Sequence, residues 1–413
     1  MNRLPRGATA ALIGLSLLAL GAGPAQALPP ASATSAASAP AASTSASAPA
    51  ASTSASTSAS ASASADGHHV RLALPRPTGP LAVGRDTLHL VDTGRPDPWV
   101  PEAGARELMV SLYYPARPGR GRTAPYMTTA EARAFLEDRD LAGTVPAETL
   151  GGTRTHARLG AAPVRGTFPL VVLSPGFTVN RATLTLLAED LAARGYVVAA
   201  VDHAYVWVGT AFPGGRLLTC AACDKVREAG YGAVPRVRAQ DVSFLIDRLT
   251  NPHPAWRHAR LIDRTRIGMA GHSIGGASAA ATMARDPRVR AGANLDGGFF
   301  DTVPAGGLGG RPFMAMGTEE EQSSWVESWP RLDGWKRWLK VTGSGHFTFT
   351  DVPVLADQLG LLPPDEPLSG DRSQAITRRY VAAFFDLHLK GAAQPLLDGP
   401  SAEHPEVVFH RSG

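Results

Sequence analysis

Hydrophobic residues alternate along the middle of the chain between short continuous runs and positions at helical spacing. The continuous runs are typical of buried strands, and a further segment that stops at Pro115 predicts one more strand. These segments are residues 107–114, 169–173, 196–201, 266–270, 290–295, 312–316 and 338–342. Apolar residues at helical spacing predict helices between them. These helices are expected over residues 182–194, 237–249, 274–285 and 375–389.

The order of these elements indicates a fold class. Strands and helices alternate, and parallel strands need crossover connections that are usually helices. The pattern therefore predicts an α/β fold with a mostly parallel, doubly wound sheet. Residues 118–165 interrupt the rhythm, because they form a Gly- and Pro-rich stretch with one helix expected over 128–137. We interpret them as a lid-like or surface insertion.

The first 66 residues have a different character from the rest. Residues 1–27 carry Arg3 and Arg6, a short apolar run and the small residues Ala25-Gln26-Ala27, which is the pattern of a secretory signal peptide. Residues 28–66 consist almost entirely of Ser, Ala, Thr and Pro, so they cannot bury enough surface to offset the entropy of ordering them. We predict a disordered tether there, and a catalytic domain over 67–413.

Composition excludes several classes of function. The chain has 413 residues, a formal net charge of +4 and two cysteines. The basic residues form no run, so we expect no nucleic-acid partner. Two cysteines exclude a disulfide-dense miniature scaffold and a four-cysteine zinc site. We expect no metal and no cofactor.

The pentapeptide Gly271-His272-Ser273-Ile274-Gly275 is the strongest chemical signal. It follows an apolar strand and precedes an Ala-rich helix, which is the strand–elbow–helix context of a nucleophilic serine. The turn presents the Ser273 hydroxyl at the carboxyl end of the sheet, and the helix N-terminus adds positive potential there. His272 should point away from the serine and act as a packing residue.

A serine nucleophile needs a base, which follows it in this chain order. Four histidines come after Ser273, at positions 346, 388, 404 and 410. His388 lies in a predicted helix, and His404 and His410 lie near the end of the chain. His346 follows a predicted strand within Gly343-Ser344-Gly345-His346, so we expect it to be the base.

The acid of the site has two contenders. Asp296 ends the first strand after the nucleophile helix, and Glu319, Glu320 and Glu321 follow the second such strand. We favour Asp296, because it is a single acid at an apolar strand end and glycines follow it. There it would orient the imidazole and stabilise its protonated form. The glutamate triplet stays the alternative on position alone.

An oxyanion hole requires two backbone N–H groups. The first is expected at Ile274, beside the nucleophile. The second should come from the loop after an earlier central strand, which here is Ser174-Pro175-Gly176-Phe177-Thr178. The N–H of Phe177 is our candidate.

These motifs resemble the platelet-activating factor acetylhydrolase family, the isoform II type of serine esterase with an α/β-hydrolase fold. The similar segments are 169–177, 196–203, 238–249, 271–277, 295–296 and 343–351, and together they lie within 107–390. The resemblance implies Ser273 as nucleophile, Asp296 as acid, His346 as base, and Phe177 and Ile274 as oxyanion donors. It also implies phospholipids with short or oxidised acyl chains as substrates.

Several other features bear on the function. We expect Cys220 and Cys223 to form a short disulfide in a loop, as suits an exported protein. Aromatic residues are expected to border the catalytic face as an acyl pocket or lipid-facing rim, or to pack locally. They are Tyr205, Trp207, Phe212, Phe299, Phe300 and Phe347. His203 follows a strand end, where such a histidine is more often structural than part of a pocket.

The sequence thus predicts a secreted, extracellular serine carboxylic-ester hydrolase that works through an acyl-enzyme. We expect a monomer that contacts a lipid or small ester substrate and touches a membrane or lipid surface transiently. The alternative activity is that of a lipase or cutinase-like polyester hydrolase, which the glycine loop and elbow also resemble. A non-catalytic binding protein on the same scaffold is a third hypothesis, and the intact Ser, Asp and His argue against it.

Overall fold

The computed structural model describes residues 70–119 and 121–410. The expected signal peptide over 1–27 and the expected tether over 28–66 lie entirely outside these residues. The strands are β1 (Ala82–Pro96), β2 (Ala105–Ala116), β3 (Arg158–Leu159), β4 (Phe168–Ser174), β5 (Val197–His203), β6 (Thr210–Phe212), β7 (Arg216–Leu218), β8 (Ile262–His272), β9 (Val289–Leu295), β10 (Phe313–Gly317), β11 (Lys336–Val341) and β12 (Val407–Phe409).

The helices alternate with the strands through the second half of the chain. They are α1 (Thr129–Asp138), α2 (Ala147–Gly151), α3 (Thr185–Ala193), α4 (Ala221–Ala229), α5 (Ala233–Thr250), α6 (Ile274–Arg285), α7 (Ser323–Ser328), α8 (Val352–Leu359) and α9 (Gly370–Lys390). The helix expected over 274–285 begins and ends where the sequence predicted. The one expected over 182–194 instead opens with a 3-10 turn, Arg181–Leu184, before α3.

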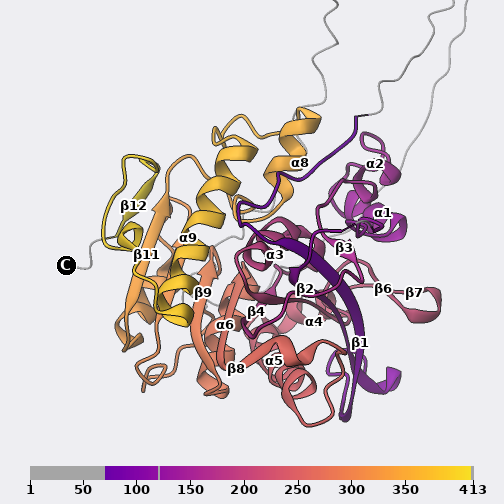
Figure 1. Cartoon of the computed structure of the whole chain (residues 1–413), viewed down its shortest axis with the longest axis horizontal. Helices are drawn as coiled ribbons and strands as arrows, with labels where there is room; N and C mark the ends of the chain where they lie inside the picture. The colour runs from indigo at the N-terminus through magenta and orange to yellow at the C-terminus, as the bar shows by residue number, and fades with distance from the viewer. Residues whose placement is uncertain (1–69, 120, 411–413) are drawn as a thin grey trace, which may run out of the picture. The chain divides into compact units, whose positions relative to one another are not determined.

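Ten strands form one sheet in the order β12-β11-β10-β9-β8-β4-β5-β2-β1-β3. The pairs from β5 through β4, β8, β9 and β10 to β11 are all parallel. β2 joins this block antiparallel to β5, and β1 joins antiparallel to β2. The predicted doubly wound, mostly parallel α/β architecture is therefore confirmed (Figure 1).

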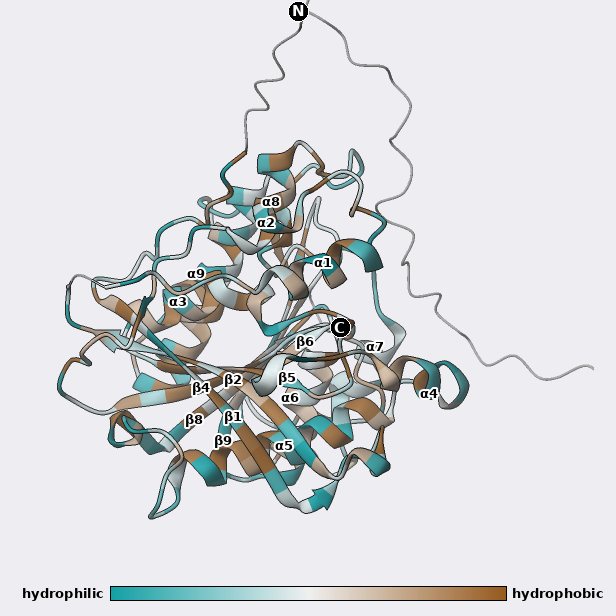
Figure 2. Ribbon diagram, turned by 90° about the vertical axis from the view of Figure 1, so that its right-hand side faces the viewer, coloured by the Kyte–Doolittle hydropathy of each residue, from teal (hydrophilic) through white to brown (hydrophobic). Residues whose placement is uncertain are grey.

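Helices cover both faces of the sheet. Side chains of α3 and α9 share one hydrophobic cluster with one face of the strands, including Leu187, Phe385 and Val198. Side chains of α5 and α6 share a second cluster with the other face, including Leu245 and Val172. Because the central parallel strands are covered on both sides, strands such as β4 and β10 are almost entirely apolar, and Figure 2 shows hydrophobic colour along central strands and hydrophilic colour on outer loops.

The 118–165 insertion packs in a third hydrophobic cluster that it shares with other segments of the chain. It contains α1, α2 and β3, and its side chains pack with α8 in this cluster, which includes Phe135, Leu150 and Leu355. Both ribbon views show α1, α2 and α8 gathered on the same side of the molecule (Figures 1 and 2). Helix α1 begins with a capping box between Thr128 and Glu131, which explains why the sequence pattern located this helix within one residue.

Candidate active site

Ser273 lies on a tight turn between β8 and α6. Its backbone has φ 54° and ψ −127°, a conformation that L residues rarely adopt and that costs about 1–3 kcal/mol. The turn is possible because glycines flank it. A Cβ on Gly275 would lie 2.0 Å from the carbonyl oxygen of Ser174, and a Cβ on Gly271 would lie 2.2 Å from the backbone of Gly275. The helix can therefore approach the neighbouring loop only without side chains at these positions.

Three of the predicted side chains meet at this turn. The Oγ of Ser273 lies 3.0 Å from Nε2 of His346, and Nδ1 of His346 lies 2.6 Å from Oδ2 of Asp296. This spacing lets the serine hydroxyl donate to the imidazole and the imidazole donate to the carboxylate. The side chain of His346 is 31% exposed, whereas that of Asp296 is 4% exposed, so the site opens on the histidine side.

Asp296, rather than the glutamate triplet, contacts the imidazole. Its backbone also has a positive φ of 57°. Its second carboxylate oxygen accepts the N–H of Thr318 at 3.0 Å and the amide of Gln322 at 3.2 Å. Glu319 instead accepts the N–H of Gly343, and Glu321 pairs with Lys340. Of the two candidate acids, only Asp296 therefore presents its carboxylate to His346.

His272 has a more specific role than the packing residue that we expected. It is 1% exposed, and its Nε2–H donates to the backbone carbonyl of His346 at 2.7 Å. Burial, together with the neighbouring His346, holds the pKa of His272 well below its usual value, so the ring is neutral. The residue before the serine therefore ties down the loop that carries His346.

The two candidate oxyanion donors lie beside the serine. Phe177 and Ile274 pack in the same hydrophobic cluster, and the contact of Gly275 with Ser174 and Pro175 brings the 174–177 loop against the start of α6. Within the described part of the chain, the N–H groups of Phe177 and Ile274 donate to no other protein group. Both donors are therefore available to a ligand at the helix N-terminus.

A buried network underlies this loop, and sequence reasoning missed it. The guanidinium of Arg238 donates to the Oγ of Ser174 at 3.2 Å, to the carbonyl of Pro175, and to the carbonyl of Gly176 at 3.2 Å. Ser174 in turn lies 3.2 Å from Nε2 of His203, whose Nδ1 lies 2.8 Å from Asp241. The loop that carries Phe177 is thus held from beneath.

Burial and charge set the ionisation of this network. Burial lowers the pKa of Arg238 to about 9 and that of His203 to about 4, so His203 is neutral at pH 7. Burial alone would raise the pKa of Asp241, but Arg106 and His203 hold it well below its ordinary value. Arg106 is 0% exposed and bonds Asp241 at 2.8 Å. The sequence-based view of His203 as structural agrees with its 2% exposure.

The aromatic residues divide between several places instead of forming one rim. Tyr205 and Phe300 pack with Phe177 and Ile274, so they do lie near the serine. Trp207 and Phe347 belong to the third hydrophobic cluster, although the Phe347 ring lies 5.6 Å from that of His346. Phe299 is fully buried in the main core, and Phe212 is 4% exposed in a small separate cluster. A single rim made of all six is therefore wrong.

One aromatic side chain near the site was not predicted. Tyr231 lies 5.5 Å from Phe177 and 6.2 Å from Phe300, measured between ring centroids. These three rings, which we call the aromatic trio, join a loop before α5 to the oxyanion loop. The isolated tyrosine between two glycines gives no sequence pattern that points to this contact.

Cys220 and Cys223 form a disulfide, as expected. Their surroundings differ from the expected loop, because Cys220 caps α4 and Cys223 lies within its first turn. Cys220 packs in the same cluster as Phe177 and Ile274. The bridge therefore fixes the start of a helix that contacts the site.

No group of three or more His, Cys, Asp or Glu side chains in residues 70–119 and 121–410 is arranged to hold a metal ion. Over the same residues, no helix has the length and apolar character needed to cross a bilayer.

Comparison with known proteins agrees with these features. The family described as platelet-activating factor acetylhydrolase, isoform II, matches residues 67–206. A probable 1-alkyl-2-acetylglycerophosphocholine esterase of Arthroderma benhamiae is 30% identical over 373 residues, which cover 81% of this chain and 93% of the relative. The platelet-activating factor acetylhydrolase of Bos taurus is 24% identical over 229 residues, about half of each chain (46% and 49%).

A solved structure is also similar. The ferulic acid esterase from Streptomyces cinnamoneus shares 49% sequence identity with this chain and superposes with a TM-score of 0.74. The match covers 82% of this chain and 99% of that one. Its similarity therefore extends over the whole fold and not only over the elbow.

Proposed function

The chain belongs to the platelet-activating factor acetylhydrolase isoform II family, and on that premise we propose that Ser273, His346 and Asp296 carry out the hydrolysis of a carboxylic ester. The chain is a serine-dependent carboxylic ester hydrolase. The observation that supports these three residues is the chain of hydrogen bonds from Ser273 through His346 to Asp296, at 3.0 and 2.6 Å.

The first half of the reaction forms an acyl-enzyme. The Oγ of Ser273 attacks the ester carbonyl carbon while its proton passes to Nε2 of His346. Asp296 accepts the Nδ1–H and stabilises the charged imidazolium. The carbonyl oxygen becomes an oxyanion that accepts the N–H groups of Phe177 and Ile274 at the start of α6. The intermediate then collapses, and the leaving alcohol takes the proton from His346.

The second half repeats these steps with water. His346 removes a proton from a water molecule, which attacks the acyl carbon and forms a second oxyanion in the same place. When this intermediate collapses, Ser273 recovers its proton from His346 and the carboxylic acid leaves. No metal or redox cofactor takes part in this balance of atoms and protons.

The substrate that we propose is a phospholipid with a short or oxidised acyl chain. The name of the fungal relative, a 1-alkyl-2-acetylglycerophosphocholine esterase, supports this class. The aromatic trio of Phe177, Tyr231 and Phe300 supplies an apolar surface beside the proposed oxyanion donors. The enzyme acts as a secreted protein, a proposal supported by the signal-like residues 1–27 and by the Cys220–Cys223 disulfide.

A second candidate substrate is a ferulate ester. The solved relative with 49% identity over 99% of its length is a ferulic acid esterase. The aromatic trio could stack on a planar aromatic acyl group, because offset and edge-to-face ring pairs are favourable. Phospholipid and ferulate therefore compete for the same proposed acyl site.

Two experiments test the proposal. A fluorophosphonate serine probe should label the wild type and fail to label a folded Ser273→Ala variant, which should also lose ester hydrolysis. A folded Ser273→Ala protein that keeps its activity would rule out the mechanism.

The substrate is tested by kcat/KM on 1-O-alkyl-2-acetyl-glycerophosphocholine, methyl ferulate and a long-chain triglyceride. A preference for methyl ferulate or the triglyceride would overturn the phospholipid assignment and leave the mechanism intact.

A further inference from the structure

A large cavity lies away from Ser273 and is lined by basic residues. Its volume is about 730 Å³, and its wall includes Arg76, Arg117, Arg154, Arg158 and His156. No aspartate or glutamate is among the described residues that line it. A volume of this size falls in the range of small-molecule sites, about 300–1,000 Å³.

The cavity and the proposed active site lie at opposite ends of the strands. The cavity wall contains Ala82 and Val83, which pair with Ala116 and Pro115 at the end of β2. The other end of β2 pairs with His203 at the carboxyl end of β5, the side on which Ser273 lies. The cavity is therefore separate from the ester-hydrolysing site.

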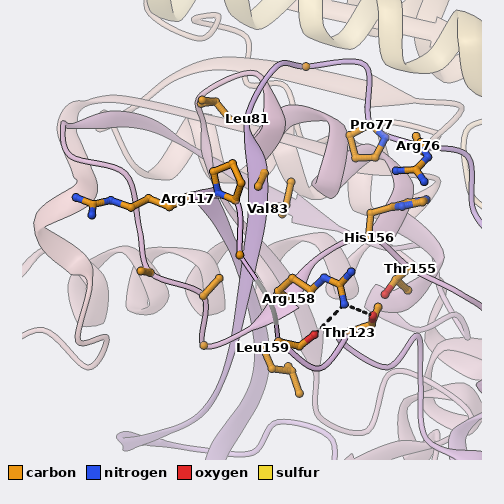
Figure 3. A pocket seen from close by; sticks show the side chains of 18 of the residues that line it. Arg76, Pro77, Leu81, Val83, Arg117, Thr123, Thr155, His156, Arg158 and Leu159 are labelled. Atoms are coloured by element: carbon orange, nitrogen blue, oxygen red, sulfur yellow. Dashed lines mark hydrogen bonds between the residues drawn. The ribbon is translucent and has the colours of Figure 1, made fainter.

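The arginines of this cavity differ from many others in the protein. Arg106, Arg288 and Arg372, for example, all bond carboxylates at 2.6–2.8 Å. Among the described residues, no carboxylate lies within ion-pair distance of the four cavity arginines, and Arg76 and Arg154 donate no side-chain hydrogen bond. Arg158 is held by the carbonyl of Gly121 at 2.8 Å and by the hydroxyl of Thr123 at 2.9 Å (Figure 3).

The charges gather around His156. Burial lowers the pKa of His156, and the positive charges of Arg76, Arg154 and Arg158 lower it further. Figure 3 shows Arg76 and His156 on one wall and Arg158 directed toward Thr123, whereas the guanidinium of Arg117 extends outward. Arg76 and two arginines of the 154–158 segment thus create a positive field at one place.

Two carboxylates contact the backbone of this region but do not line the cavity. Glu189 is 1% exposed and accepts the N–H groups of His156 and Ala157, and burial raises its pKa to about 7. Asp190 is 0% exposed and pairs with Arg194 and Arg378. Both side chains lie on α3 and are buried, so neither presents its carboxylate to the cavity.

We propose that this cavity is a binding site for a ligand with several phosphate groups, held by Arg76, Arg154 and Arg158. Guanidinium groups present paired N–H donors that match the oxygens of phosphate, and they remain charged at all physiological pH values. Like charges held together around a cavity repel one another, so a multivalent anion relieves this repulsion. The phosphates could belong to a soluble compound or to lipid headgroups.

The test uses tripolyphosphate as the probe and the full-length protein at low ionic strength. Isothermal titration calorimetry should show saturable binding to the wild type, and Arg76→Gln and Arg154→Gln should each weaken it at least about tenfold. The matched control is Arg260→Gln, which removes the same charge from an exposed position outside the cavity and should change binding less than about twofold. These arginine side chains bond no described protein group, so the variants should fold.

Two results would overturn the proposal. One is the absence of saturable binding to the wild type, and the other is equal weakening in all three variants, which would indicate general charge attraction.

Co-sedimentation with phosphatidylcholine vesicles, with and without phosphatidic acid, separates the two sources of phosphate. Vesicle binding that tripolyphosphate displaces and that both cavity variants weaken identifies lipid headgroups, and tripolyphosphate binding without vesicle binding identifies a soluble ligand. Both cavity variants should hydrolyse 4-nitrophenyl acetate as fast as the wild type. A loss of phosphate binding in these variants can then be told apart from a failure of the proposed active site.

Discussion

Ser273, His346 and Asp296 are joined by hydrogen bonds in the same order as Ser174, His203 and Asp241. The serine–imidazole distances are 3.0 and 3.2 Å, and the imidazole–carboxylate distances are 2.6 and 2.8 Å. Residue types and distances therefore do not distinguish the two arrangements. We call the first the open triplet and the second the buried triplet.

The surroundings of the two triplets are very different. The imidazole of His346 is 31% exposed, whereas that of His203 is 0% exposed. Ser174 ends a regular strand and already accepts a hydrogen bond from Arg238, but Ser273 lies on a strained turn at a helix N-terminus. An ester carbonyl can reach only the open triplet, so we assign chemistry to it and support of the oxyanion loop to the buried one.

The comparison predicts that substituting Asp296 mainly lowers activity, whereas substituting Asp241 mainly lowers stability. Asp296→Asn should lower kcat by about 10⁴-fold with little change in stability, because the imidazole loses its orienting acceptor. Asp241→Asn should lower the free energy of unfolding by about 3 kcal/mol, because the buried Arg106 loses one of its two carboxylate partners and keeps only Asp97. Steady-state kinetics and urea unfolding of both variants measure this. A stability loss for Asp296→Asn equal to that of Asp241→Asn would contradict the division of roles.

Arg238 joins the buried triplet to the loop that carries Phe177, so its removal should affect catalysis at the open triplet through that loop. Arg238→Met frees the carbonyls of Pro175 and Gly176, and we expect kcat to fall by about 10²-fold, near the effect of losing one oxyanion donor. KM should change little. The matched control is Arg95→Met, because Arg95 pairs with Asp241 at 2.9 Å but makes no hydrogen bond to the described residues of the loop. Equal kcat losses in both variants would show that Arg238 has a general structural role and does not act through the oxyanion loop.

Acid should destabilise the fold through the buried triplet. In the unfolded chain His203 takes up a proton below its ordinary pKa of 6.5, but in the folded protein its pKa is lowered to about 4. The unfolded state therefore binds more protons between pH 6.5 and 4, so stability falls as the pH falls through this window. Across the whole window, the titration of His203 lowers the free energy of unfolding by roughly 3 kcal/mol.

The His203→Asn variant isolates this contribution. Its unfolding free energy should depend less steeply on pH between 4 and 6.5 than that of the wild type, since the other histidines are common to both proteins. Urea unfolding at several pH values within the window measures the two slopes. Identical slopes would show that His203 titrates normally in the folded state.

The smallest effect is expected for the serine of the buried triplet. Ser174→Ala removes a hydroxyl that links Arg238 and His203, and we expect a loss of about 1 kcal/mol in stability and an activity within a few-fold of the wild type. The same substitution at position 273 should abolish hydrolysis. Thermal unfolding and kcat/KM of the two alanine variants form a matched pair, and inactivation by Ser174→Ala would reverse the assignment.

Local signals explain how much of this could be predicted. Helix α6 was predicted at its true bounds because the glycine elbow and the Ala-rich run mark both ends. Strand β1 was missed, since polar residues such as Asp86 and Asp92 interrupt its apolar pattern and pairing with β2 stabilises it. The position of the cysteines at the start of a helix was also missed, because no capping side chain marks where the short helix α4 begins, although the alanines between them favour a helix.

The sequence by itself determined the fold class and the residue types of the open triplet, because periodicity and the glycine elbow are local properties. Only the tertiary structure decided which carboxylate faces His346 and that Arg238 and Asp241 are buried. Charged side chains usually face water, yet Arg238 and Asp241 are 2% and 0% exposed. A charge can be buried only where partners from distant segments meet it, and no local pattern contains that information.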